Sequence, residues 1–375
     1  MRTEIHINTA LIPWAINRAG FDLHEFLQAD QRVQLWLDGK KLPTVKQLET
    51  FAKKVFLPFG YLFLQEPPRE EIPFPFFRTA LKENRAVNIN VYDTILLLKQ
   101  RQDWLREYLQ ENEFRQLTFT KRYNGSQDIA AIVENMRAIL DLPEDWARQM
   151  PTWPDALDHL AKHIENIGII TVFNGVVENN NTRKIPVDEC RGFVMVDDWA
   201  PFMFVNNADS KAAQMFTLAH ELAHVWIGSS AGFDFRNMQP ANDPTELLCD
   251  RIAAEFLVPE QSFRESWRGR PDIANQARHY KVSPIVIARR AQDLGFITRT
   301  QFLEFYNAYI LREFTKKEAG SSGGDFYATS RKRISVTFAS HINNALKSGK
   351  LLHRDAYRLT GLRGDTFETF FTKYL

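Results

Sequence analysis

One stretch decides the fold, Met215-Phe216-Thr217-Leu218-Ala219-His220-Glu221-Leu222-Ala223-His224-Val225-Trp226-Ile227-Gly228. It predicts a helix, because Asp209 or Ser210 can cap its start and Gly228 followed by two serines ends it. Most of its side chains are apolar, which indicates a buried helix. Three polar side chains lie within it in the pattern His-Glu-x-x-His, and buried polar groups require partners.

The pattern His-Glu-x-x-His predicts a metal site. Residues four apart share a helix face, so His220 and His224 can offer two imidazole nitrogens to one ion. Glu221 lies one step round the helix, where it can reach a water on that ion. Zinc with few protein ligands keeps an open position for water and lowers its pKa, and Glu221 would act as general base, as in zinc peptidases. The alternative is a coincidence of polar residues on a surface helix.

A second predicted helix, within residues 242–259, offers the third ligand. It starts at an Asp-Pro-Thr turn, in which Thr245 is a candidate cap, and ends at a proline. Glu246 lies in its first turn and Asp250 four residues on, on the same face. Glu246 is predicted to bind the metal, and Asp250 to accept the free N–H of a ligand histidine, most simply His220. The alternative is a solvated carboxylate pair on an amphipathic helix.

A purely structural zinc is a further alternative, since structural sites are closed by four protein ligands. Cys249 lies three residues after Glu246, near the same face, and is the residue to examine as a fourth ligand. Downstream, His279 and Tyr280 are the nearest polar candidates for stabilising an oxyanion. Tyr280 is more simply a core aromatic residue, so the oxyanion role is left unassigned.

Composition narrows the class of protein and its compartment. The 375 residues allow two or three domains, and the formal net charge of +1 argues neither for nor against a nucleic-acid partner. No apolar run approaches the roughly 20 residues of a membrane span. The N-terminus does not read as a signal peptide, and the two cysteines do not form a disulfide framework. These features predict a cytoplasmic protein without membrane contact.

Residues 1–65 predict five short helices joined by tight turns, typical of a helix-turn-helix module. Trp14-Ala15, Gly20, Val33-x-x-Trp36-x-x-Gly39 and Pro43-Thr44-x-x-Gln47-Leu48-x-x-Phe51-Ala52 resemble the phage-repressor-type (XRE) helix-turn-helix. The match implies a recognition helix near residues 31–37. Side chains there can read bases and two lysines can touch phosphate; the candidates for DNA contact are Gln31, Arg32, Gln34, Lys40 and Lys41.

The charge of this module gives DNA binding little support. Residues 1–65 hold eight Lys or Arg against six Asp or Glu, a thin electrostatic footprint. A helical protein-interaction module without DNA binding is therefore the alternative.

The rest of the chain is predicted as an α+β protein with a small sheet. Residues 66–125 form a proline-rich linker and a long amphipathic helix, a scaffold or homodimerisation element. Residues 126–315 form the metallopeptidase domain, with strands at 169–173, 193–196 and 202–205, and residues 316–375 form a helical C-terminal region. The edge of the third strand is expected to pair with a peptide substrate, with Asn206 binding its backbone; the alternative for Asn206 is a turn residue.

Most of the chain resembles the ImmA/IrrE family of metallo-endopeptidases, in the form with an XRE module ahead of the peptidase, and the resemblance is most specific in residues 190–260. The resemblance rests on Asn181-Thr182-Arg183, Arg191-Gly192-Phe193, Asn206, Phe216 to His224, and Glu246-x-x-Cys249-Asp250-x-x-Ala253-x-Glu255-Phe256-Leu257-x-Pro259. It implies zinc on His220, His224 and Glu246, with Glu221 as base. The family often has Asn where this chain has Asp250, and a carboxylate orients a histidine at least as well.

The resemblance implies a zinc-dependent endopeptidase that cleaves a protein regulator, such as a repressor or antitoxin, in stress response or mobile-element control. The alternative is a DNA-binding transcriptional regulator or antitoxin whose zincin-like fold senses or binds a partner with little proteolysis. The sequence identifies neither the substrate nor an operator.

Overall fold

The computed structural model describes residues 4–70, 76–77, 88–233, 243–269, 272–316 and 325–375. The chain is divided into two compact units. Unit 1 contains Met1–Pro73 and Asn84–Ile95, and unit 2 contains Phe74–Glu83 and Leu96–Leu375. Much of the proline-rich linker predicted after residue 65 lies outside the described residues. No helix among the described residues is long and apolar enough to cross a membrane.

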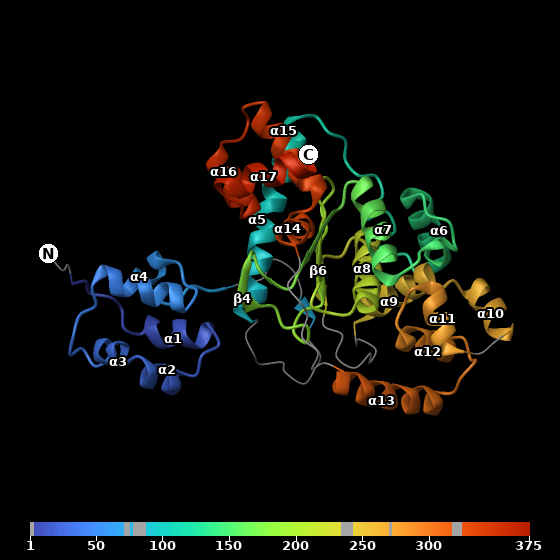
Figure 1. The fold of residues 1–375 in the computed structure, drawn as a ribbon, viewed down its shortest axis with the longest axis horizontal. Helices are drawn as coiled ribbons and strands as arrows, with labels where there is room; N and C mark the ends of the chain where they lie inside the picture. Colours follow the sequence, from blue (N-terminus) through green and yellow to red (C-terminus); the bar gives the residue numbers. More distant parts are fainter. Residues whose placement is uncertain (1–3, 71–75, 78–87, 234–242, 270–271, 317–324) are drawn as a thin grey trace. The chain divides into compact units, whose positions relative to one another are not determined.

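Unit 1 contains the five predicted helices (Figure 1). They are α1 (Leu11–Arg18), α2 (Leu23–Ala29), α3 (Gln31–Leu37), α4 (Val45–Lys54) and the short 3-10 helix η1 (Phe59–Phe63). Thr44 and Gln47 form a reciprocal capping box at the start of α4, which satisfies backbone N–H groups that the helix cannot pair itself. The interior is apolar, with Trp36 and Phe26 packed edge-on against Phe51. The predicted helices are confirmed, while the helix-turn-helix identity stays a prediction.

Unit 2 is a mixed α/β structure built on a five-stranded sheet with the order β1-β7-β5-β6-β2. The strands are β1 (Phe76–Phe77), β7 (Ala231–Phe233), β5 (Gly192–Met195), β6 (Phe202–Asn206) and β2 (Ile170–Asn174). β2 and β6 are parallel, whereas β5 is antiparallel to both of its neighbours, β6 and β7. A separate two-stranded sheet pairs β3 (Val176–Val177) with β4 (Asn180–Lys184).

The three strands predicted from sequence correspond to β2, β5 and β6. The prediction that β6 offers a free edge is wrong, because β6 lies between β5 and β2. A central strand has both rows of backbone groups paired within the sheet, so β6 cannot add a substrate strand.

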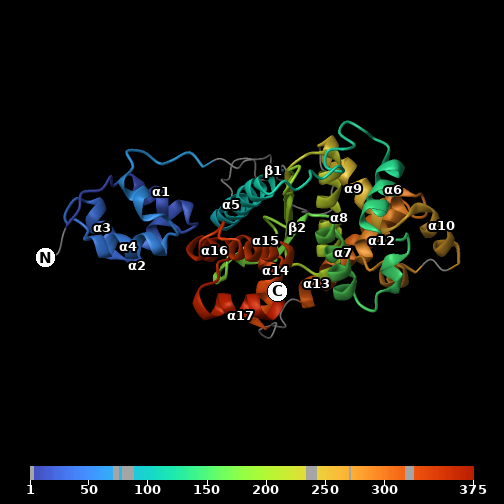
Figure 2. The same cartoon turned by 90° about the horizontal axis from the view of Figure 1, so that it is seen from above.

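Helices surround this sheet, and the metal-site helix α8 packs against it. The helices are α5 (Ile89–Glu111), α6 (Ile129–Leu140), η3 (Trp146–Gln149), α7 (Trp153–Asn166), α8 (Lys211–Ile227), α9 (Pro244–Leu257), α10 (Glu260–Gly269), α11 (Ile273–Tyr280), α12 (Pro284–Asp293), α13 (Arg299–Lys316), α14 (Phe326–Ile334), α15 (Val336–Lys347), α16 (His353–Thr360) and α17 (Gly364–Tyr374). α8 contacts β5, β6, α7 and α9, and Figure 2 shows α7 and α8 side by side.

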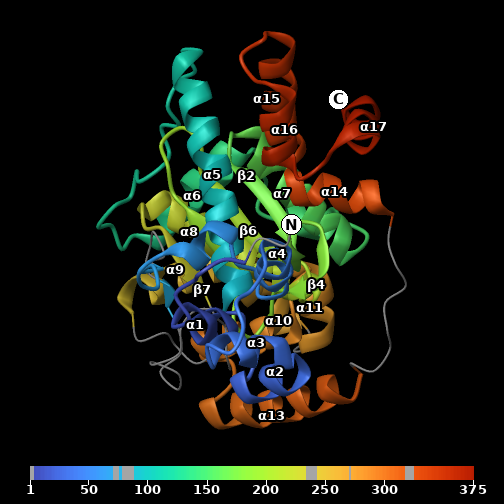
Figure 3. The same ribbon diagram turned by 90° about the vertical axis from the view of Figure 1, so that its left-hand side faces the viewer.

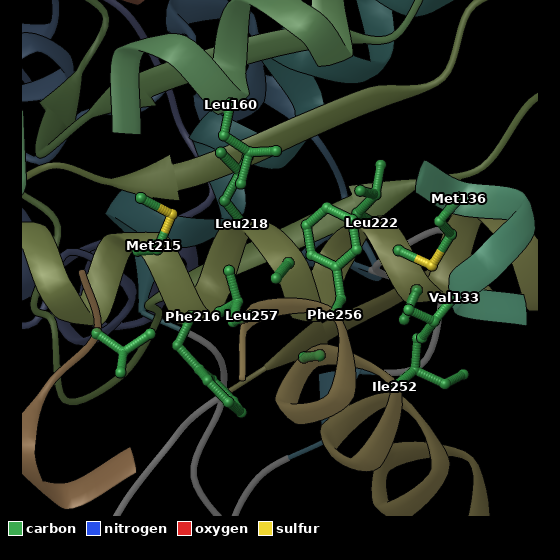
Figure 4. Packing of buried hydrophobic residues seen from close by; sticks show 14 of the residues in the cluster. Val133, Met136, Leu160, Met215, Phe216, Leu218, Leu222, Ile252, Phe256 and Leu257 are labelled. Atoms are coloured by element: carbon green, nitrogen blue, oxygen red, sulfur yellow. The ribbon is translucent and has the colours of Figure 1, made fainter. Parts of the chain in front are cut away.

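The core of unit 2 is centred on α8, where every residue from Gln214 to Ile227 is buried. In Figure 4 the ring of Phe256 on α9 points toward Leu222, while Leu160 of α7 meets Leu218 from the other side. Burying one such side chain stabilises the fold by about 1.5–3 kcal/mol. This apolar packing fixes α9 against α8, and so determines where their polar side chains meet.

The C-terminal helices belong to unit 2. α14 packs along β2 and covers that edge of the sheet, while α15 and α16 lie beside α5 (Figure 3). Gln102 of α5 donates hydrogen bonds to the carbonyls of Met195 and Ala200, at the ends of β5 and β6. Its neighbour Arg101 donates to the carbonyls of Leu359 and Arg333. One turn of α5 therefore joins the sheet to the C-terminal helices.

Candidate metal centre

Helix α8, which carries the two histidines, has a clear cap at each end. Ser210 caps its start by accepting a hydrogen bond from the backbone N–H of Ala213, as predicted. Gly228 ends it in the left-handed conformation, with a φ of 83° that favours glycine. The two histidines lie in the second half of this helix, one turn apart on the side that packs against α9.

Helix α9 begins immediately before its ligand candidate. The cap is Asp243, whose carboxylate accepts hydrogen bonds from the backbone N–H groups of Thr245 and Glu246. The prediction of Thr245 as cap is wrong, because the preceding Pro244 lacks an N–H and already occupies the first helical position. The cap thus holds the backbone of Glu246 directly.

The side chains of His220, His224 and Glu246 converge at one buried point. Nε2 of His220 lies 3.0 Å from Oε2 of Glu246 and 3.1 Å from Nε2 of His224. Nε2 of His224 lies 3.3 Å from Oε1 of Glu246. Tetrahedral ligands that are each about 2.05 Å from a zinc ion are about 3.3 Å from one another. The spacing of these three donors therefore fits one small cation.

Asp250 lies on the other side of His220. Its Oδ1 is 3.0 Å from Nδ1 of His220, the ring nitrogen that faces away from the converging donors. A hydrogen bond at Nδ1 leaves the lone pair of Nε2 available to a metal. The structure therefore brings Asp250 to the position predicted from the spacing within α9.

Electrostatics couples these groups in the metal-free chain. Burial alone would lower the pKa of His220, but hydrogen bonds to Asp250 and Glu246 outweigh burial and raise that pKa to about 10. Burial would raise the pKa of Glu246, yet its hydrogen bonds to His220 and His224 lower it to about 2. Burial lowers the pKa of His224. Without a cation, the His220 ring is therefore protonated on both nitrogens at neutral pH and lies between two carboxylates.

Glu221 is buried beside this cluster and faces strand β5. Its pKa is raised well above the ordinary value, chiefly by burial. Within the described residues, neither of its carboxylate oxygens has a hydrogen-bond partner. A buried carboxylate without partners costs free energy, so its orphaned oxygens point to a missing ligand such as a cation with its water.

Gly192, the first residue of β5, lies close to Glu221. A Cβ atom there would lie 2.5 Å from Cγ2 of Thr217, 2.9 Å from the carbonyl of Phe204 and 3.1 Å from Oε1 of Glu221. Glycine is therefore required by this close approach of strand and helix. Gly192 belongs to the pattern that resembles the family, but its role is visible only from the packing of β5 on α8.

Cys249 does not join the metal cluster. Among the described residues, the group whose ligand atoms converge consists of two histidines and Glu246 alone. Burial raises the pKa of the Cys249 thiol well above its usual range, which disfavours the thiolate that binds zinc. A closed four-ligand site through Cys249 therefore has no support from the geometry.

Asn206 has a different role from the predicted one. Its side-chain amide donates to the carbonyls of Ile185 and Cys190, and its Oδ1 accepts from the N–H of Ala208. The residue is fully buried. The prediction that it binds substrate backbone is wrong, because its polar atoms already hold the loop before β5 to the end of β6. Its open alternative, a residue that ends the strand, agrees with these contacts.

Tyr280 is a core aromatic residue, as its simpler interpretation predicted. It is buried, and its hydroxyl lies 2.9 Å from Oγ of Ser262 within the helical unit after α9. The oxyanion role therefore remains without an assigned residue.

The residues predicted to contact DNA lie on α3 or just after it, in unit 1: Gln31, Arg32, Gln34, Lys40 and Lys41. Acidic neighbours already engage three of these side chains. Arg32 forms two hydrogen bonds with Asp30, while Gln34 and Lys40 both donate to Asp38. These local pairs reduce the positive charge that α3 offers to a phosphate backbone.

Two segments of the chain match models of protein families. Residues 334–373 match a family model described only as a domain of unknown function. Comparison with curated proteins found no match. Residues 169–292, which include β2, β5, β6, α8 and α9, match the model of the IrrE N-terminal-like domain, a peptidase family. This match supports the ImmA/IrrE family for the segment that carries the metal cluster, and with it a metallopeptidase-like function.

Proposed function

We propose that this protein is a zinc-dependent endopeptidase. The observation that carries the proposal is the convergence of His220, His224 and Glu246 beside the unpartnered carboxylate of Glu221. Three protein donors leave a fourth position for solvent or substrate, which is typical of catalytic rather than structural zinc. The peptidase family match covers the same helices.

Each of the four residues has a chemical role in this proposal. When bound, zinc would polarise the scissile carbonyl and lower the pKa of a water molecule. Glu221 takes the proton from the attacking water and later delivers it to the leaving amine. Asp250 keeps His220 in the tautomer that presents Nε2 to the metal.

The substrate in this proposal is a protein regulator, such as a repressor or antitoxin, and residues 1–65 are a helix-turn-helix module that brings the chain to DNA or to its partner. The support is the resemblance to the fused family form and the five helices of unit 1. A homodimer and a cytoplasmic location are compatible with this function.

A second candidate is a regulator that binds a partner through the zincin-like fold and cleaves little. One observation favours it: His220, Glu221, His224 and Glu246 are each 0% exposed, so a substrate has no direct access to them. The two functions are separated by a substitution that removes the base and keeps the metal.

The test compares zinc-loaded wild-type protein with Glu221→Gln on a proteome-derived tryptic peptide library, with new termini identified by mass spectrometry. We expect cleavage by the wild type and none by Glu221→Gln at equal zinc content. His224→Ala should lose both zinc and cleavage, while Glu134→Gln, on the exposed surface of α6, serves as the matched control. Equal cleavage by Glu221→Gln would contradict the role of Glu221 as base, and the absence of cleavage by the zinc-loaded wild type would contradict the peptidase function.

A further inference from the structure

Strand β5 begins beside Glu221, and its outer side is the one that faces away from β6. Gly192 is the first residue of this strand. A Cβ atom at this residue would lie 3.1 Å from Oε1 of Glu221. A peptide paired with β5 at Gly192 would therefore pass near the proposed base. Strand addition of this kind uses backbone hydrogen bonds and accepts many side chains.

This edge of β5 is occupied by another part of the same chain. β7 pairs antiparallel with β5, with Gly192 opposite Phe233, Phe193 opposite Gly232 and Val194 opposite Ala231. Just beyond this pairing, the backbone N–H of Val196 donates to the hydroxyl of Ser230. Residues 230–233 therefore pair with the backbone along the outer side of β5.

β7 is held in the sheet by fewer paired residues than β6, the other neighbour of β5. It is three residues long and follows the end of α8 at Gly228 after two serines. Its outer neighbour is β1, a strand of two residues. In contrast, β6 pairs with β5 over four residues and with β2 over five. Each ladder hydrogen bond contributes about 0.5–1.5 kcal/mol, so the β5–β7 contact is the weaker side of β5.

Neither β6 nor β2 offers a comparable place for a substrate strand. β6 is central in the sheet, and β2 is covered by α14. The proposed ligands and base are also buried from solvent, so a peptide cannot reach them while the present pairing persists. Among the described strands, β5 is then the one beside Glu221 from which a neighbour can leave.

We propose that the outer edge of β5, residues 192–194, is the docking edge for an extended peptide substrate, and that β7 stands in the place of this peptide until it binds. The bound peptide would replace β7 and run antiparallel to β5, with its backbone passing Gly192 and Glu221. This inference rests on the proposed peptidase function, and it explains how a closed site admits a substrate.

A reversible tether tests the exchange of strands. Opposite residues of antiparallel strands have Cα atoms about 4.5–5.5 Å apart, within the range that a disulfide spans. Val194→Cys with Ala231→Cys joins β5 to β7. We expect the oxidised, zinc-loaded double variant to lose cleavage of the tryptic peptide library, and a thiol reductant to restore it without a change in zinc content.

The matched control joins β5 to its other neighbour. Val194→Cys with Met203→Cys links β5 to β6, which stays in place in the proposed exchange, so oxidation should leave cleavage unchanged. Cleavage by the oxidised β5–β7 variant at the rate of its reduced form would overturn the inference while leaving the peptidase function intact. If reduced variants and wild type alike cleave nothing with zinc bound, the proposed function fails instead.

Hydrogen–deuterium exchange gives a second measurement that needs no tether. We expect the peptide library, added in excess to zinc-loaded Glu221→Gln protein, to speed amide exchange at residues 231–233 and leave residues 202–206 protected. Unchanged protection of 231–233 in the presence of bound peptide would contradict the replacement of β7.

Discussion

Asp250 connects the second helix of the site to a ligand on the first. Its contact with Nδ1 of His220 orients the ring, and loss of such a partner typically weakens metal binding 10- to 100-fold. We therefore expect Asp250→Ala to reduce zinc affinity by about 10- to 100-fold and Asp250→Asn to reduce it less. Competition with a chromogenic chelator measures the affinity. Arg251→Ala, at the exposed neighbouring position, should bind zinc like the wild type; an unaltered affinity in Asp250→Ala would contradict the orienting role.

The raised pKa of His220 predicts how metal binding depends on pH. With a pKa of about 10, His220 is protonated at pH 7 in the metal-free chain, and the metal must displace this proton. We expect release of about one proton at pH 7 and an affinity that rises roughly tenfold per pH unit from 7 to 9. Calorimetry in two buffers of different ionisation enthalpy measures the release. Binding without proton release would show that His220 is already neutral.

The same pKa determines how the metal-free chain responds to pH. The pKa of His220 is raised above its ordinary value of 6.5, so its contacts with Glu246 and Asp250 stabilise the fold fully below that pH. This stabilisation is lost as the pH rises toward about 10. Thermal unfolding of chelator-treated protein should therefore occur at lower temperature at pH 9 than at pH 7, and added zinc should reduce the difference. A melting temperature that rises over this range would contradict the sign.

At this scale, the sequence was informative where chemistry depends on spacing within one helix. His220 and His224 share a face of α8, and Glu246 and Asp250 share a face of α9, so their grouping followed from helical geometry. The role of Asn206 could not be found this way, because its partners at Ile185 and Cys190 lie 21 and 16 residues away in the sequence.

Helix α9 depends on its cap for the position of Glu246. Asp243 accepts two backbone hydrogen bonds in the first turn, one of them from Glu246 itself. We expect Asp243→Ala to lower the free energy of unfolding by about 1 kcal/mol and to weaken zinc binding as well. Asp272 caps α11 through the same pair of contacts and is the matched control. Asp272→Ala should cost similar stability and leave zinc affinity unchanged; equal effects of both variants on zinc would contradict the positioning role.

The sequence predicted which helices and strands form better than it predicted which strands lie side by side in the sheet. The helices of unit 1, α8, α9 and strands β2, β5 and β6 follow from periodicity and caps that are local in sequence. The order of the sheet does not, because the alternation of side chains along β6 is the same for a central and an edge strand. β7 was not predicted at all, since a three-residue strand carries almost no periodic signal.

One buried arginine, Arg101, joins α5 to the C-terminal helices of unit 2. Arg101 is buried, which lowers its pKa to about 10, and it donates to the carbonyls of Arg333 and Leu359 near the ends of α14 and α16. Carbonyls at helix C-termini carry partial negative charge, so a cation is favourable there. Arg101 thereby fixes the C-terminal region that covers the β2 edge.

Removal of this side chain should loosen the C-terminal region. We expect Arg101→Ala to lower the free energy of unfolding by roughly 2–4 kcal/mol, because two backbone carbonyls lose a buried, charged donor. Urea unfolding measures the loss, and limited proteolysis should cut residues 325–375 sooner than in the wild type. Arg106→Ala, on the same helix but partly exposed, should cost at most about 1 kcal/mol. Equal stability losses for both variants would contradict this role of Arg101.

Zinc stoichiometry of Glu246→Ala, measured by elemental analysis beside the wild type, tests the central claim most directly. Glu246 lies on α9 and the two histidines lie on α8, so Glu246 joins them only in the folded chain. The account predicts about one zinc per wild-type chain and substoichiometric, easily removed zinc in a folded Glu246→Ala protein. A folded Glu246→Ala protein that keeps a full equivalent of zinc with wild-type affinity would contradict it.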